Sequence, residues 1–98
     1  GRKAKEVIET WKPDLVIAAD DNASAYLIAP FYRNADLPFV FCGVNWDAGS
    51  YGFPCRNVTG MIEVDLVDSM VRAMQKYASG TRLAALGADN ESNRKAVD

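Results

Sequence analysis

Histidine is absent from the 98 residues of this chain, and with it the commonest general base of enzymes. Serine nucleophiles depend on such a base, so Ser24 and Ser50 have no evident partner for covalent chemistry. The sequence also lacks a G-x-G-x-x-G motif, a P-loop and a pair of cysteines at the close spacing of a metal site. These absences argue against an enzyme, and we predict no catalytic residue, no cofactor and no metal ligand.

Long hydrophobic runs and an excess of positive charge are missing as well. The longest apolar runs, residues 15–19 and 38–44, fall far short of the roughly 20 residues that span a membrane. The formal net charge of -2 argues against a nucleic-acid surface, which needs a concentrated field of Lys and Arg. A content of 49% hydrophobic and 24% charged residues is ordinary for a soluble globular chain, and the length suits one small domain or part of a larger one.

Cysteine is scarce, and its two occurrences decide little. Cys42 lies inside an apolar run, where a free cysteine behaves as a small buried hydrophobic residue. A disulfide between Cys42 and Cys55 would need an oxidising compartment and Cα atoms within about 7 Å of each other. The sequence leaves this pairing open.

The hydrophobic pattern alternates between helical spacing and short continuous runs. Apolar residues at 4, 7, 8 and 11 share one face of a helix, whereas the continuous run at 15–19 is typical of a strand covered on both faces. The elements expected in chain order are a helix over 2–12, a strand over 15–19, a helix over 23–31, strands over 38–44 and 58–64, a helix over 65–80, a strand over 82–86 and a last helix opening at 87–90.

This alternation predicts an α/β fold, with a mostly parallel sheet and helices on both faces. Trp11 and the methionines Met61, Met70 and Met74 are expected to be buried in the core. A helix that leads such a sheet normally packs beside a preceding strand, so we expect the chain to be an internal segment of a larger protein.

Helix capping is one interpretation of several polar residues. Residues 20–22 follow the first strand and suit the N-cap of the next helix. Asp65 and Asp68 resemble the start of a capping box, and Gly80 lies where a C-cap glycine is expected.

Ligand binding is the other interpretation of the residues that follow the strands. The carboxyl ends of parallel strands meet at one edge of the sheet, and open α/β sheets bind ligands there. Backbone N–H groups at a helix N-terminus suit a carboxylate and acidic side chains suit an amine, so an amino-acid-like ligand fits this edge. The ligand-binding residues that we expect are Asp21, Asn22, Asn45, Trp46 and Asp47.

The aromatic residues near this edge, Trp46, Tyr51 and Phe53, have two interpretations. They could stack on a planar or apolar ligand, or they could cover the open end of the sheet. Glu63, on the third strand, could likewise face a cleft or make a structural ion pair.

Three stretches carry a resemblance to a known family. The sequences KPDLVIAADDNASAYLIAP, LPFVFCGVNWDAGSYGFPCRNVTGM and RLAALGADNESNRKA together resemble substrate-binding proteins of ABC transporters related to predicted tryptophan/tyrosine uptake receptors. The match covers essentially the whole chain, and Asn57-Val58-Thr59-Gly60 is its most specific part. Members commonly carry Thr-Asp-Pro after the second strand, and of that motif only Asp47 is present.

The resemblance implies a type I periplasmic-binding-protein fold, in which two lobes close on a solute. Residues 1–57 would be the end of the first lobe, 58–64 a strand that crosses the hinge, and 65–98 the start of the second lobe. Closure would occur about the hinge residues Gly60, Met61 and Glu63. The family also implies a periplasmic or extracytoplasmic location, with or without a lipid anchor, and the membrane subunits of an ABC importer as partners.

Two other functions remain open beside transport. The same module serves as the ligand-sensing region of membrane signalling proteins, and a regulatory α/β domain would instead use Asp20 and Asp21 to bind a divalent cation. Because the lobes would be incomplete and would expose sheet edges, we also expect the isolated segment to self-associate.

Overall fold

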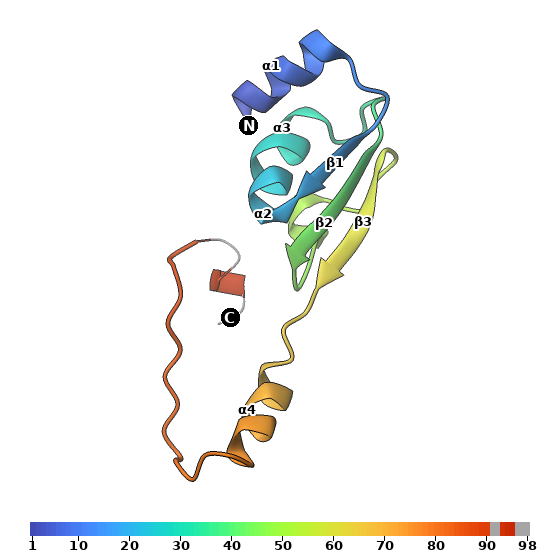
Figure 1. Cartoon of the computed structure of the whole chain (residues 1–98). Coiled ribbons are helices and arrows are strands. Elements are labelled where there is room, and N and C mark those ends of the chain that lie inside the picture. The colour runs from blue at the N-terminus through green and yellow to red at the C-terminus, as the bar shows by residue number, and fades with distance from the viewer. Residues whose placement is uncertain (91–92, 96–98) are drawn as a thin grey trace.

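The structure is a computed structural model that describes residues 1–90 and 93–95. Figure 1 shows a sheet with helices beside it, followed by a helix and an extended chain that lie apart from the sheet. The elements are α1 (Arg2–Trp11), β1 (Val16–Ala19), a helical run made of α2 (Asp20–Ala23), the π-helical turn η1 (Ser24–Ile28) and α3 (Ala29–Phe31), then β2 (Phe39–Asn45), the 3-10 turn η2 (Gly49–Tyr51), β3 (Val58–Glu63) and α4 (Val67–Gln75).

The three strands form one parallel sheet in the order β1-β2-β3, which confirms the prediction of an α/β fold. Val16 pairs with Phe39, and Phe39 pairs in turn with Val58. The register between β2 and β3 shifts between Phe41 and Val44, around Gly43, whose φ of 69° falls in the left-handed region. This shift changes the direction of the side chains at the end of β2, where the expected site residue Asn45 lies.

The hydrophobic core lies on one face of the sheet. Phe39, Phe41, Val44 and Val58 point from the strands toward the helical run, where Leu27 and Ile28 meet them; all six are buried. The opposite face has no cover within the described residues, and Ile17 and Met61 there are 71% and 73% exposed. The expected burial of β1 on both faces, and helices on both faces, are therefore not seen in this part of the chain.

Several residues expected in the core are at the surface. Trp11 is 77% exposed, because α1 packs on the helical turn η1 and Ile8 is its residue next to the core. Met70 and Met74 on α4 are also exposed, since no second layer covers that helix among the described residues. These predictions were wrong because helical spacing identifies an apolar face but not a partner for it.

The first helix ends as its sequence predicts. Lys12 adopts a left-handed conformation with φ 55°, its N–H donates to the Ile8 carbonyl, and Pro13 follows. The strand boundaries at β1, β2 and β3 likewise match the expected ones to within a residue or so.

The chain beyond β3 differs most from expectation. Helix α4 begins at Val67 with no side-chain cap bond, so the capping box of Asp65 and Asp68 is not formed, and it ends at Gln75, well before Gly80. Residues 82–86 form no strand: Leu83 and Leu86 are exposed, and no strand among residues 1–90 and 93–95 pairs with them. A helical turn at 93–95 lies near the expected last helix, of which residues 91–92 and 96–98 fall outside the described part.

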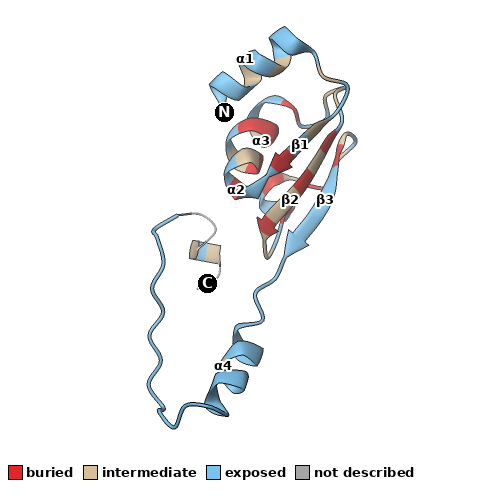
Figure 2. Cartoon of the chain, in the orientation of Figure 1, coloured by how far each residue is buried: buried red, intermediate tan, exposed pale blue. Residues whose placement is uncertain are grey.

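The two parts of the chain differ in packing. Figure 2 shows the buried residues within the sheet, the helical run and the chain between β2 and β3, whereas α4 has no buried residue. The radius of gyration is 17.2 Å, against about 13 Å for a compact chain of this length. The core therefore belongs to residues up to Val58, and the rest extends away before it returns to the sheet. None of the described helices combines the length and the apolar character that a bilayer crossing requires.

Candidate functional site

Two of the expected site residues meet at the carboxyl ends of β1 and β2. Asp21 accepts two hydrogen bonds at Oδ2, one from the backbone N–H of Asn45 at 3.1 Å and one from its side-chain Nδ2 at 2.9 Å. Asn45 follows the register shift around Gly43, where an added Cβ would lie 3.4 Å from the backbone nitrogen of Asp20. The edge predicted from strand direction is therefore occupied by a polar cluster.

Asp21 is fully buried, and α2 has no side-chain capping hydrogen bond, so the expected capping role is not seen. Its Oδ1 accepts the hydroxyl of Tyr51 at 2.7 Å and the ammonium of Lys95 at 2.6 Å. Burial alone would raise the pKa of Asp21, but the hydrogen bonds from Lys95, Asn45 and Tyr51 outweigh it and hold the pKa well below its usual range. Asp21 is therefore a buried carboxylate that stays charged because donors surround it.

The ammonium group of Lys95 is enclosed by groups that suit a primary amine. Besides Asp21 Oδ1, it lies 3.0 Å from the carbonyl oxygen of Asp47 and 3.3 Å from that of Asn45. It also lies 4.4 Å from the centre of the Tyr51 ring, within cation–π range. We call the set of Asp21, Tyr51 and the two carbonyl groups of Asn45 and Asp47 the ammonium cradle.

Backbone geometry around the cradle is strained. Asp20 and Trp46, which follow the ends of β1 and β2, have φ values of 77° and 64°. A left-handed conformation costs a non-glycine residue of order 1 to 3 kcal/mol, and such residues concentrate at functional sites. Local bonds hold both: Asp20 Oδ1 accepts the N–H of Asp21 at 2.7 Å, and Trp46 donates its N–H to the carbonyl of Glu63 at 2.7 Å.

The indole of Trp46 lies outside the cradle. It lines a hollow of about 440 Å³ together with the chain that links β3 to α4 and the first turns of α4, including Leu66 and Arg72. Its Nε1 atom is buried and has no hydrogen-bond partner within the described residues. Trp46 lies between Asn45 and Asp47 in sequence, but the lining of this hollow includes none of the cradle residues.

The other expected site residues take less direct parts. Asp47 contributes its backbone carbonyl to the cradle, while its carboxylate accepts the N–H of Gly49 at 2.9 Å. Asn22 is exposed at the start of the helical run. Tyr51 and Phe53 are both buried, and the Phe53 ring stacks on Phe41 at 5.4 Å, so these two aromatics cover the sheet.

The expected hinge residues lie on β3. A Cβ at Gly60 would overlap the carbonyl oxygen and ring of Phe41, so glycine is needed there for close packing of the strands. Met61 is exposed, and Glu63 ends the strand with its carbonyl bonded to Trp46. The chain turns away from the sheet directly after Glu63 (Figure 1).

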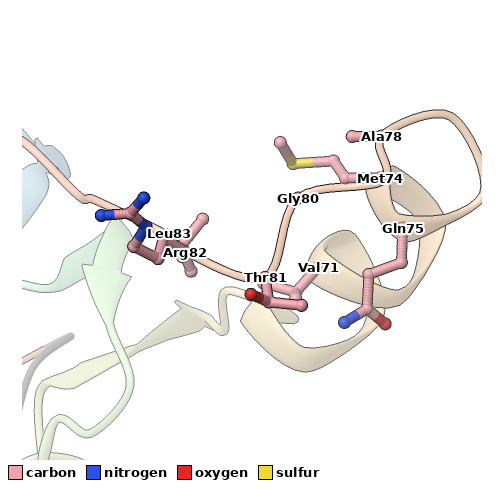
Figure 3. A pocket seen from close by; sticks show the side chains of 8 residues that line it. All are labelled: Val71, Met74, Gln75, Ala78, Gly80, Thr81, Arg82 and Leu83. Atoms are coloured by element: carbon pink, nitrogen blue, oxygen red, sulfur yellow. The ribbon is translucent and has the colours of Figure 1, made fainter.

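A different hollow lies between α4 and the chain that follows it. Figure 3 shows its lining, which is mostly aliphatic and comes from neighbouring stretches of sequence; the residues are Val71, Met74, Gln75, Ala78, Gly80, Thr81, Arg82 and Leu83. It lacks the convergent polar groups of the cradle, so we do not take it as the site.

Other chemistries find less support in this geometry. Asp21 directs its oxygens at hydrogen-bond donors, and the described residues contain no cluster of three or more His, Cys, Asp or Glu side chains suited to a metal ion. Cys42 and Cys55 are both free thiols.

Tyr51, a member of the cradle, and Lys95, whose ammonium group the cradle holds, were not expected in these roles. Tyr51 was noted only as an aromatic residue near the sheet edge, and its hydroxyl bond to Asp21 depends on the turn η2. Lys95 lies 74 residues from Asp21 in sequence, and no local pattern connects them.

Comparisons of the chain with protein-family models, with curated protein sequences and with solved structures found no match.

Proposed function

We propose that the chain is a segment of an extracytoplasmic solute-binding protein that captures an amino-acid-like molecule between two lobes for an ABC importer. The observation that carries the proposal is the ammonium cradle, which places a charged, buried carboxylate at the ligand-binding edge of a parallel sheet. In this proposal residues 1–57 end the first lobe, 58–64 cross the hinge and 65–98 begin the second lobe.

The packing of the chain supports this division. Among the residues that the structure describes, the buried core lies between Ala18 and Val58, and α4 and the chain around it contribute no buried residue. Residues that begin a second lobe would lack a core until the rest of that lobe packed on them. Residues 93–95 nevertheless return to the carboxyl edge of the sheet, as a second lobe that faces the first across a cleft would do.

We assign the rest of such a ligand to the hollow that Trp46 lines. With its ammonium group in the cradle, an amino acid would extend its side chain toward the indole of Trp46, and Arg72, which shares this lining with Asp65 and Asp68, would supply a cation for the carboxylate. A volume of about 440 Å³ falls in the usual range for small-molecule sites. The ligand contacts would then come from both parts of the chain, as closure about β3 requires.

The alternatives are weaker on the same geometry. A regulatory domain that binds a divalent cation would present Asp20 and Asp21 to the ion, whereas Asp21 accepts hydrogen bonds from Asn45 and Tyr51. A sensor region of a membrane signalling protein would use the same cradle, so it differs from a transport receptor in its partners and not in its ligand chemistry.

Native mass spectrometry of the purified protein, before and after mild denaturation, tests this proposal. We expect a released small molecule that carries a primary amine, or a mass increase when amino acids are added. A mass that stays unchanged across a panel of amino acids would contradict it.

A matched pair of tryptophan variants tests the position of the ligand. Trp46→Ala should weaken binding of the identified molecule, whereas Trp11→Ala should leave it unchanged, because Trp11 lies on α1, away from the carboxyl edge. Equal ligand affinities of the two variants would show that Trp46 is not part of the binding site.

A further inference from the structure

Lys95 reaches the cradle from the far end of the chain. Its ammonium group is surrounded by Asp21 Oδ1 and by the carbonyl oxygens of Asn45 and Asp47, and its side chain is only 15% exposed. An ammonium group carries three N–H donors, and the cradle provides three acceptors of the oxygen type that it prefers. The ring of Tyr51 adds a cation–π contact to this set.

The tether that carries Lys95 contributes little to holding it there. Residues 76–90 are all exposed, and Figure 1 shows them running as an extended chain from α4 back to the sheet. A short flexible linker gives an effective concentration in the millimolar range, and we expect a similar value for this exposed tether. The ammonium group can therefore leave the cradle without disturbing the core of the sheet.

We propose that the ammonium cradle is a binding site for the primary ammonium group of a small molecule, and that Lys95 is its internal occupant, which such a ligand must displace. This inference rests on the proposed function, because it names the part of the ligand that the first lobe holds. Ligand binding and the docking of residues 93–95 in this position then exclude each other.

The geometry also defines which cations fit. Contacts of 2.6 to 3.3 Å between nitrogen and oxygen require N–H donors, so a quaternary ammonium ion, which has none, cannot approach as closely. The carboxylate of Asp21 distinguishes cations from neutral amides, because its pKa is held low and it remains charged at neutral pH. The expected class is a primary amine, protonated, with its substituent directed out of the cradle.

The test uses ethylammonium as the probe and the Lys95→Ala variant of the full chain. Ethylammonium is titrated against wild type and variant, and the backbone amide signals of Asn45 and Asp47 are followed by NMR. Removing Lys95 should strengthen ethylammonium binding at least tenfold, since the internal competitor is gone. Tetramethylammonium, which lacks N–H groups, should bind neither protein at these amides.

Two further variants control the result. Asp21→Asn added to Lys95→Ala should abolish binding, whereas Asp36→Asn added to Lys95→Ala should leave it unchanged, because Asp36 pairs with Arg56 at the surface. Should Lys95→Ala fold poorly, ethylammonium should restore its urea midpoint toward the wild-type value, and tetramethylammonium should not. Equal affinity of wild type and Lys95→Ala for ethylammonium, or equal binding or rescue by tetramethylammonium, would overturn the inference.

The two proposals fail separately. Suppose that ethylammonium binds to Lys95→Ala but native mass spectrometry finds no bound amino acid. The ammonium site is then supported, and the proposed solute-binding function is refuted. Suppose instead that the protein releases an amino acid but ethylammonium does not bind to Lys95→Ala. The proposed function is then supported, and the cradle is refuted as an ammonium-binding site.

Discussion

Replacing Asp21 by Asn should destabilise the chain more than any other single removal of charge. The Asp21 side chain is completely buried and accepts hydrogen bonds from Asn45, Tyr51 and Lys95. An asparagine in its place keeps the shape but turns one oxygen into an NH₂ group, which then faces another donor. It also removes the counter-ion of Lys95, which is 15% exposed.

The size of the effect follows from burial. Breaking a buried ion pair by removing one partner costs about 3 to 5 kcal/mol. We expect the lower end, about 3 kcal/mol, because Lys95 is carried by the exposed stretch 76–90 and can turn toward water when its partner is lost. Since small domains have total stabilities of roughly 5 to 15 kcal/mol, this is a large fraction of the whole.

Urea unfolding followed by far-UV circular dichroism measures the effect. Asp36→Asn is the matched control, because it breaks the Asp36–Arg56 ion pair with an Asp36 side chain that is 100% exposed, and we expect no measurable change. A free energy of unfolding for Asp21→Asn that equals that of Asp36→Asn would refute the argument that the buried carboxylate organises this edge.

The same carboxylate gives the stability a pH dependence. Because the folded pKa of Asp21 is lowered, its contribution is fully present above its unfolded pKa, near 3.9, and is lost as the pH falls below that value toward the folded pKa. The difference in unfolding free energy between wild type and Asp21→Asn should therefore shrink as the pH falls from about 5 to about 2. A difference that stays constant over this interval would contradict the assignment.

Two further predictions concern the sheet. Gly60→Ala should destabilise the chain, because the added Cβ would overlap Phe41. Gly80→Ala should be neutral, since nothing lies within 4 Å of its added Cβ. Equal urea midpoints for the two variants would contradict this prediction. The chain should self-associate through its uncovered sheet face, and Ile17→Lys should lower its mass in light scattering; a monomeric wild type would contradict this.

Local sequence patterns predict the first two thirds of the fold well. The helical spacing before Lys12 and the apolar runs that follow it place α1 and the three strands almost correctly. Each of these elements is specified by the spacing of apolar residues within its own segment. The direction of the strands then predicts that Asp21 and Asn45 meet at the carboxyl edge, as they do.

The remaining features depend on partners that a local pattern does not identify. Residues 82–86 have the composition of a strand, but the described part of the chain offers no strand to pair with them. Trp11 lies on the apolar face of α1, which nothing in that part of the chain covers at this position. Asp21 has the composition of a helix cap, yet burial and its donors make it the centre of the cradle. Lys95 joins this centre across nearly the whole chain, which only the three-dimensional arrangement can reveal.

The most direct test of the central claim, that the carboxyl edge of this sheet binds an amino-acid-like molecule, is an NMR titration of the ¹⁵N-labelled chain with a panel of amino acids. The account predicts that the amide signals of residues 20–22 and 45–47 shift together, and that the same amino acids without their amino group leave them in place. Shifts confined to α4, or none at millimolar concentration, would contradict it.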